Sequence, residues 1–199
     1  MAAARSPRDN HLLDAVEALP REAWSGPVWR VVREGRDPTQ CSAVGGRWDD
    51  RSFEVLYTST HEDGARAEMF FHLSRGQPVM PSQVRYGLHE LHVTLDACVR
   101  IASLEVLAGL GLVLAGLGLK TGAFGQLSYS ERQLEYPRTQ EIAEAAHFHG
   151  RDGLFVPSAR SAHPNLVVFS GVAGPEAVEV VRDHGIVDWT AWRNAQRNG

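Results

Sequence analysis

The chain has 199 residues, of which 43% are hydrophobic and 22% are charged, and 20 basic against 24 acidic residues give a formal net charge of −4. This composition is typical of one globular domain with a sizeable core, and its negative charge gives no general electrostatic reason to bind nucleic acid or an anionic membrane. Cys41 and Cys98 are the only cysteines and form no CxxC pair, so neither a disulfide framework nor a cysteine zinc site is indicated and a reducing cytoplasm is expected.

The N-terminal residues bear on export, and one apolar run bears on membrane insertion. The first residues lack a continuous apolar core, because Arg5, Arg8 and Asp9 interrupt it, so we expect no signal peptide. The uncharged run Val106–Leu119 is shorter than the roughly 20 residues that a membrane-spanning helix needs. We therefore expect this run to be a buried core segment.

The first half of the chain is predicted to alternate helices and strands. A helix capped by Asp9 or Asn10 carries an apolar stripe that ends before Pro20. β-branched and aromatic residues indicate two strands, and a second helix follows them. The predicted elements are a helix over Asp9–Leu19, a strand over Val28–Arg33, a loop over Glu34–Gly46, a strand over Phe53–Thr58 and a helix over Thr60–Ser74.

The second half is predicted to contain strands between helices. Alternating apolar residues indicate a strand over Leu91–Leu95 that continues through Cys98–Ala102. No repeat or Pro/Ser-rich linker divides the chain, which favours a single mixed α+β domain. The remaining predictions are a polar connection over Thr121–Pro137, a helix over Thr139–Phe148 stopped by Gly150, short strands over Leu154–Val156 and Leu166–Phe169, and closing helices over Gly174–His184 and Trp189–Asn198.

The helix Thr60–Ser74 places one carboxylate in an apolar setting. At 3.6 residues per turn, Ala65 and Met69 share one side, and Glu68 falls between the directions of Ala65 and Phe71. A carboxylate in a buried helix is costly unless cations or hydrogen-bond donors meet it. The sequence therefore predicts a small-molecule site around Glu68. The alternative is a surface carboxylate beside an arginine, which contributes about 0–1 kcal/mol.

The run Gly45-Gly46-Arg47-Trp48 has the residue types of a ligand-binding loop. Paired glycines let the backbone approach a ligand, and the Arg47 guanidinium offers a fork of donors suited to phosphate. Trp48 could stack on a flat ring. Taken alone, the same run favours a turn followed by a surface arginine and a core tryptophan.

Common catalytic and metal motifs are absent from the sequence. The pairs His89/His92 and His147/His149 match no zinc spacing, because a zincin needs HExxH on a helix and no nearby Cys or Asp cluster completes a set of ligands. There is no GxSxG, no Walker loop and no GxGxxG opening a helix after a strand. We expect structural or surface histidines and no metal.

Five short motifs in fixed order resemble those of a known family. They are VWRVV, GGRW, VLYTS, ARAE and GLFVPSARSAHPNLVVFSG. Together they make the stretch Val28–Gly171 similar to the RES domain. The resemblance implies a fold like that of ADP-ribosyltransferases, with a helical segment over 1–27, an NAD-binding catalytic domain over 28–171 and a helical segment over 172–199 packed on the same domain.

Carried over position by position, the resemblance implies specific site residues. The catalytic residues would be Glu68, Arg47 and Tyr57, and the substrate-binding residues would be Arg30, Trp48, Ser158 and Arg160, with Asn165 shaping the loop after Ser158. The stretch DDRSFEVL between Trp48 and Tyr57 departs from the family, where a small Gly- or Pro-containing turn is more common. That departure would alter the mouth of the pocket.

The resemblance also implies an activity and partners. Members are toxins of bacterial toxin–antitoxin pairs that cleave the nicotinamide–ribose bond of NAD⁺, some as phosphorylases and others as glycohydrolases. No cofactor is implied: NAD⁺ is the substrate and inorganic phosphate a co-substrate. The partner would be an antitoxin of the Xre-like helix-turn-helix type, in a complex that contains a homo-oligomer of the toxin. Two alternatives remain open, an ADP-ribosyltransferase that modifies a macromolecule and a catalytically degenerate protein-binding module.

Overall fold

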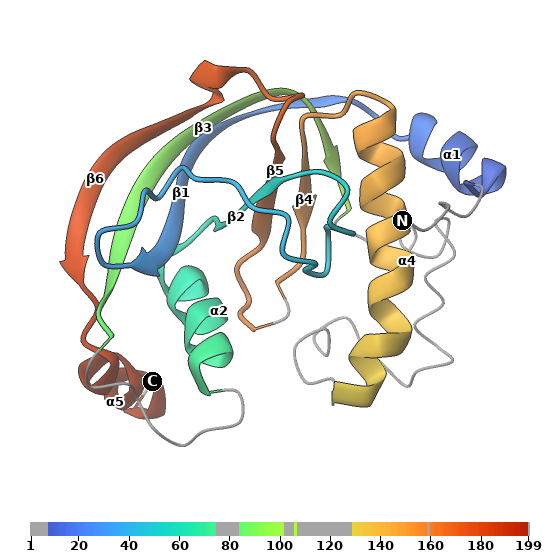
Figure 1. Cartoon of the computed structure of the whole chain (residues 1–199). Helices are drawn as coiled ribbons and strands as arrows, with labels where there is room; N and C mark the ends of the chain where they lie inside the picture. Colours follow the sequence, from blue (N-terminus) through green and yellow to red (C-terminus); the bar gives the residue numbers. More distant parts are fainter. Residues whose placement is uncertain (1–7, 75–83, 102–105, 107–128, 159, 199) are drawn as a thin grey trace, which may run out of the picture.

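The structure is a computed structural model that describes residues 8–74, 84–101, 106, 129–158 and 160–198. In these ranges helices and strands are interspersed along the chain (Figure 1). In order they are α1 (Asn10–Glu17), β1 (Glu22–Arg33), β2 (Val55–Ser59), α2 (Glu62–Ser74), β3 (Tyr86–Arg100), α4 (Tyr129–Phe148), β4 (Gly153–Val156), β5 (Asn165–Phe169), the 3₁₀ turn η3 (Pro175–Ala177), β6 (Val178–Ile186) and α5 (Trp189–Asn198). The expected mixed α+β domain is confirmed.

Five of the strands close into a ring, and the sixth extends it. The order β1-β2-β5-β4-β3 is completed by a second pairing of β1 with β3, and β6 adds to β3. All pairs are antiparallel except β3 with β4. β1 and β3 arch together over α2 (Figure 1). At the outer pair, His184 Nε2 contacts Glu90 Oε2 at 3.1 Å and links β6 to β3.

Alternation along the strands divides most of the buried side chains between two clusters, and a smaller third cluster contains Val31, Ala65 and Leu88. Val55 and Leu56, neighbours on β2, belong to different clusters because successive strand residues point to opposite faces. The first cluster joins the sheet to α1 and α4 and includes Val16, Ile142 and Ala146. α1 lies beside the C-terminal end of α4 (Figure 1), where His149 Nε2 contacts the Leu13 carbonyl oxygen at 3.1 Å. The apolar stripe predicted for the first helix therefore packs as expected.

Two predicted helix ends are confirmed, the cap of α1 and the end of α4. Asp9 caps α1, because its Oδ1 accepts from the backbone N–H of His11 at 3.0 Å and of Leu12 at 3.4 Å. Gly150 follows α4 with φ of +66°, the left-handed conformation that ends many helices at a glycine. No helix in the described ranges is long and apolar enough to cross a membrane.

Two predicted elements are wrong. The segment Gly174–His184 is not a helix but contains η3 and most of β6, because Val178, Val180 and Val181 favour a strand and the edge of β3 offers backbone partners. The segment Tyr129–Pro137, predicted as a connection, belongs to α4, which contains Pro137. The rest of that connection and residues 107–119 of the predicted core segment lie outside the described residues.

The division of the chain into terminal helical segments needs the same correction. β1 begins at Glu22, so residues 22–27 are strand and not part of a helical N-terminal segment. Between 172 and 199, α5 is helical as predicted, but the segment before it is not, because the 3₁₀ turn η3 and the strand β6 occupy 175–186. Both ends thus contribute to the sheet or pack against it.

Candidate active site

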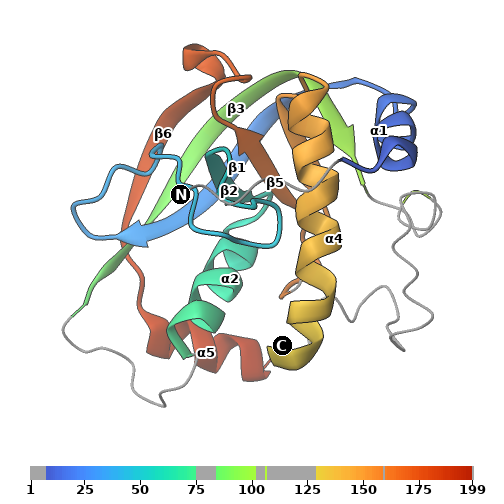
Figure 2. The same ribbon diagram turned by 45° about the vertical axis from the view of Figure 1, so that its right-hand side comes forward.

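A cavity of about 530 Å³ lies among β1, the segment joining β1 to β2, α2 and the loop that joins β4 to β5. The joining segment crosses in front of the strands toward α4 (Figure 2). Six of the seven residues predicted for catalysis or binding line this cavity: Arg30, Arg47, Trp48, Tyr57, Glu68 and Arg160. The seventh, Ser158, is not a lining residue, but its hydroxyl donates a hydrogen bond to Glu68, which is one. Residues separated by more than a hundred positions in sequence thus meet at one place.

Two hydrogen bonds hold the Glu68 carboxylate. Its Oε1 accepts from Ser158 Oγ at 2.7 Å and from Asn165 Nδ2 at 2.9 Å. The Ser158 hydroxyl itself accepts from the backbone N–H of Arg160 at 3.0 Å and of Ser161 at 3.2 Å. Because both backbone groups are donors, the single hydroxyl proton of Ser158 is directed to Glu68. The other carboxylate oxygen of Glu68 receives no hydrogen bond from the described residues.

The setting of Glu68 differs from the buried helix that the sequence predicted. Within α2 only Gly64 and Ala65 are buried. Met69 and Phe71 are half-buried and line the cavity, and Met69 also packs against the small cluster of Val31, Ala65 and Leu88. The apolar residues around Glu68 are therefore the walls of a cavity, which explains why the periodicity of this helix resembled that of a core helix.

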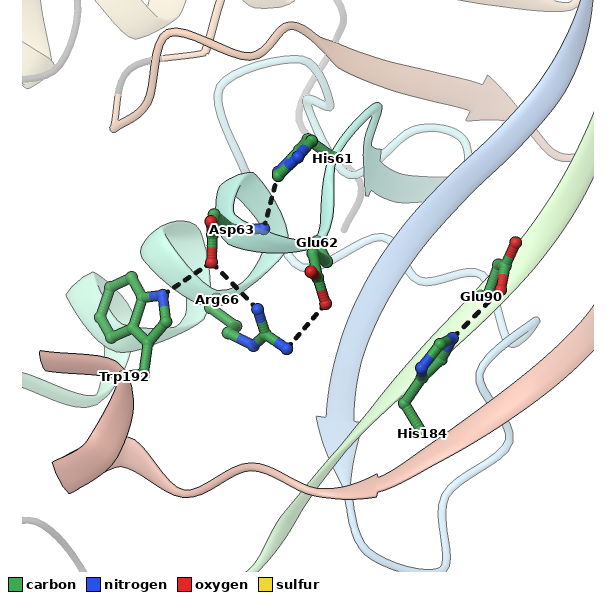
Figure 3. A network of polar contacts seen from close by, with 7 residues as sticks. All are labelled: His61, Glu62, Asp63, Arg66, Glu90, His184 and Trp192. Atoms are coloured by element: carbon green, nitrogen blue, oxygen red, sulfur yellow. Dashed lines mark hydrogen bonds and ion pairs between the residues drawn. The ribbon is translucent and has the colours of Figure 1, made fainter. Parts of the chain in front are cut away.

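A polar network fixes the first turns of α2 (Figure 3). Asp63 Oδ1 accepts from Trp192 Nε1 of α5 at 3.0 Å and from Arg66 Nη1 at 2.9 Å. Arg66 Nη2 also contacts Glu62 Oε2 at 2.8 Å, and the Asp63 N–H donates to His61 Nδ1 at 3.1 Å. The helix that carries Glu68 is therefore attached to α5 as well as to the sheet.

The loop that carries Ser158 is held against the start of α2. His163 stacks on His61, with ring centroids 3.9 Å apart and an interplanar angle of 11°. The Thr60 N–H donates to the Pro164 carbonyl oxygen at 3.0 Å. Because Pro164 directly precedes Asn165, which bonds Glu68, these contacts between the loop and the start of α2 help to position the carboxylate.

Asp49, which the sequence did not single out, organises the glycine loop. Its carboxylate is fully buried, and Oδ1 accepts from the Gly45 N–H at 2.7 Å while Oδ2 accepts from the Gly46 N–H at 2.6 Å. The Tyr57 hydroxyl donates to Oδ2 at 3.1 Å and accepts from the Trp48 N–H at 2.9 Å. A signal was present in the sequence, because aspartate shortly after a glycine pair is suited to binding turn amides.

Tyr57 and the two glycines fit this loop closely. Burial, and then the negative charge of Asp49, raise the pKa of Tyr57 well above its ordinary value, so its hydroxyl stays protonated. Gly45 has φ of +83°, and a Cβ on Gly46 would lie 2.5 Å from the Tyr57 hydroxyl oxygen. Gln140 of α4 donates from Nε2 to the Gly46 carbonyl oxygen at 2.7 Å. The sheet and α4 thereby fix the backbone on both sides of Arg47.

Three of the arginines that line the cavity are held by different contacts. Arg30 donates from Nη1 to the carbonyl oxygens of Pro38 at 2.7 Å and Gln40 at 2.8 Å. Burial lowers the pKa of Arg30. Arginine side chains nevertheless stay charged in proteins. The Arg160 guanidinium lies 3.3 Å from the centroid of the Phe71 ring, and that of Arg47 lies 5.7 Å from the centroid of the Tyr136 ring. Each aromatic contact restricts where the cation can point.

Trp48 has a more structural position than the other predicted residues. It lines the cavity, yet it is only 4% exposed and belongs to the hydrophobic cluster of α1 and α4. Most of its ring therefore packs in the core, as the alternative interpretation of this motif had it. Asn165, expected only to shape the loop, instead contacts Glu68 directly.

Two of the histidines weighed as metal ligands, His92 and His147, have structural surroundings. His147 stacks on Phe53 with ring centroids 4.5 Å apart, and His92 Nε2 contacts Ser25 Oγ at 3.1 Å. Within the described ranges, no three His, Cys, Asp or Glu residues are grouped so that they could hold a metal ion.

Comparisons with known proteins identify the family and the fold of the chain. A family model of the RES domain matches residues 27–193, which extends past Gly171 into β6 and α5. A comparison with curated protein sequences gives no significant match. Among solved structures, a chain of the M. tuberculosis MbcT–MbcA toxin–antitoxin complex is similar in fold, with a TM-score of 0.74 and 18% sequence identity over 95% of this chain and 98% of that chain. Since the RES model covers most of the sequence, the chain belongs to the RES domain family.

Proposed function

We propose that the chain is the toxin of a bacterial toxin–antitoxin pair and that it cleaves the nicotinamide–ribose bond of NAD⁺. One observation carries the proposal: Glu68 is held by Ser158 and Asn165 at the wall of a cavity that arginines also line. A fixed carboxylate and several guanidinium groups are complementary to a dinucleotide, which has a ribose that becomes positively charged during cleavage and a negatively charged diphosphate.

Glu68 would act on the ribose. When the bond between ribose C1′ and the nicotinamide nitrogen breaks, the bonding electron pair leaves with nicotinamide, which departs as a neutral molecule. The ribose then has oxocarbenium character, and a nearby carboxylate stabilises it. Water or inorganic phosphate attacks C1′ to complete the reaction, and water releases one proton when it does so. No general acid is needed for the neutral leaving group.

The other predicted residues would bind and orient the substrate. Arg47 and Arg160 would contact the diphosphate, because their guanidinium groups supply paired donors for phosphate oxygens. Arg30 would add positive charge while it holds the segment at Pro38 and Gln40. The Tyr57 ring would form an aromatic wall for nicotinamide, and its hydroxyl would keep the glycine loop in place.

The fold of the solved neighbour supports a partner protein. That structure is a toxin–antitoxin complex, and we propose that this chain is likewise inhibited by an antitoxin, of the Xre-like helix-turn-helix type. The proposed complex contains more than one copy of the toxin and acts in the cytoplasm, where NAD⁺ is consumed. Copurification of the chain with the product of an adjacent gene, followed by measurement of the complex mass, tests this part.

An assay of NAD⁺ products tests the activity. Purified protein is incubated with NAD⁺, with and without inorganic phosphate and candidate protein acceptors, and the products are separated by mass. Free ADP-ribose indicates hydrolysis, a phosphorylated ADP-ribose indicates phosphorolysis, and labelled protein indicates transfer to a macromolecule. Intact NAD⁺ in every mixture would refute the proposed function and favour a binding module.

Glu68→Gln tests the carboxylate itself. We expect the variant to fold normally, because glutamine keeps an oxygen that accepts from Ser158 and Asn165, but to lose at least about 100-fold in turnover. Glu179→Gln, an exposed carboxylate on β6, is the matched control and should retain full turnover. Normal activity of Glu68→Gln would show that the central carboxylate has been wrongly assigned.

A further inference from the structure

The rim of the cavity carries two arginines that the proposed chemistry does not use. Arg33 and Arg36 both line the cavity and are exposed. They are the first and last residues of a tight turn, closed by a hydrogen bond of 3.0 Å from the Arg36 N–H to the Arg33 carbonyl oxygen. Gly35 adopts φ of +78° within this turn. Such a turn brings the two Cα atoms within about 7 Å of each other.

The carboxylates next to these arginines are turned toward other partners. Glu34 Oε2 lies 3.5 Å from Arg85 Nε, outside the turn. Asp37 Oδ1 accepts from both the N–H and the hydroxyl of Thr39, at 2.8 Å and 2.7 Å. In the described ranges, neither guanidinium group has an ion pair or hydrogen bond of its own. The turn therefore presents two cations to whatever occupies the outer part of the cavity.

The charge of the cavity exceeds what NAD⁺ requires. Five arginines and two carboxylates line it, a net charge of +3 in a chain whose net charge is −4. NAD⁺ carries about −1, because its cationic nicotinamide offsets one of two diphosphate charges, whereas a phosphomonoester on the adenosine ribose adds about −1.5 to −2. The additional charge matches the two rim arginines.

We propose that Arg33 and Arg36 form a subsite for a phosphate dianion beyond the diphosphate, and that the cavity accepts NADP⁺ through its 2′-phosphate. The inference rests on the proposed function, because it extends the substrate of the same site. Paired guanidinium groups are the side chains best suited to a terminal phosphate. Inorganic phosphate has the same chemistry, so the experiment separates the two sources.

The test compares NAD⁺ and NADP⁺ as substrates of the wild type and of the Arg33→Ala/Arg36→Ala variant. We expect the wild type to cleave NADP⁺ with kcat/KM at least equal to that for NAD⁺. In the double variant the KM for NADP⁺ should rise at least about tenfold more than the KM for NAD⁺. Arg182→Ala, an exposed arginine on β6 outside the cavity, is the control and should leave both KM values unchanged.

Three outcomes would overturn the subsite. The first is a wild type that cleaves NAD⁺ but prefers it to NADP⁺ by more than about tenfold, which leaves the proposed function standing. The second is equal loss for both dinucleotides in the double variant. The third is a rise in the KM for inorganic phosphate only. If neither dinucleotide is cleaved, the proposed function fails, and calorimetric titration then tests the subsite separately. Tighter binding of NADP⁺ to the wild type than to the double variant would support the subsite. Equal binding to both proteins, or no binding, would refute it.

Discussion

Replacement of Tyr57 by phenylalanine separates the two roles assigned to this side chain. The substitution keeps the ring that lines the cavity and removes only the hydroxyl, which donates to Asp49 and accepts from the Trp48 N–H. If the hydroxyl serves the loop and the ring serves the substrate, Tyr57→Phe should reduce stability and weaken binding through Arg47 more than it reduces turnover.

The expected loss of stability follows from the donors that remain. Trp48 is 4% exposed, so its N–H loses an acceptor where water cannot easily replace it, at a cost of about 1–3 kcal/mol. Asp49 Oδ2 keeps the Gly46 N–H at 2.6 Å, so its loss is smaller. The free energy of unfolding should fall by about 2 kcal/mol. In a chain of this length, that change lowers Tm by about 4–8 °C.

Urea unfolding of Tyr57→Phe measures this change, with Tyr86→Phe as the matched control. Tyr86 has an edge contact with Trp189, and its hydroxyl has no hydrogen bond in the described part of the chain, so the control should stay within about 0.5 kcal/mol of the wild type. Equal midpoints for the two variants would refute the assigned role in the loop. A loss of more than about 100-fold in kcat with unchanged stability would show that the hydroxyl takes part in the chemistry.

Two further substitutions test the site and its surroundings. Asn165→Ala removes one of the two hydrogen bonds to Glu68. It should lower kcat/KM about tenfold, equivalent to about 1.4 kcal/mol, which is a smaller effect than that of Glu68→Gln. Steady-state kinetics on both variants measure this, and a kcat/KM of Asn165→Ala equal to that of the wild type would contradict it. Asp37→Asn tests pH dependence: hydrogen bonds from the Thr39 N–H and hydroxyl lower the pKa of Asp37 in the folded state, so its stabilising contribution is present above the unfolded pKa of about 3.9 and is lost as pH falls further. Urea unfolding between about pH 5 and pH 3 should therefore show a shallower loss of stability in the variant, and identical slopes would exclude this contribution.

The sequence by itself determined the local structure wherever a pattern was repeated or capped. The stripe and Asp9 cap of α1, the apolar β-branched strands β4 and β5 and the glycine after α4 depend on neighbours in the chain. The order of short motifs likewise determined the family. Periodicity also indicated that Glu68 was unusual, but it could not distinguish a core from the wall of a cavity, since both place apolar residues at the same spacing.

Only the tertiary structure decided what Glu68 contacts. Asn165 and Ser158 reach it because β5 pairs with β2, which leads into α2, and no pattern within α2 encodes that pairing. The same holds for Asp49, because the Tyr57 hydroxyl that donates to it is placed there by β2. It also holds for β6, which is a strand because the edge of β3 offers it backbone partners. Local propensity defined the elements. Long-range backbone hydrogen bonds between strands decided which residues share the cavity, because strand pairing is what brings side chains distant in sequence together.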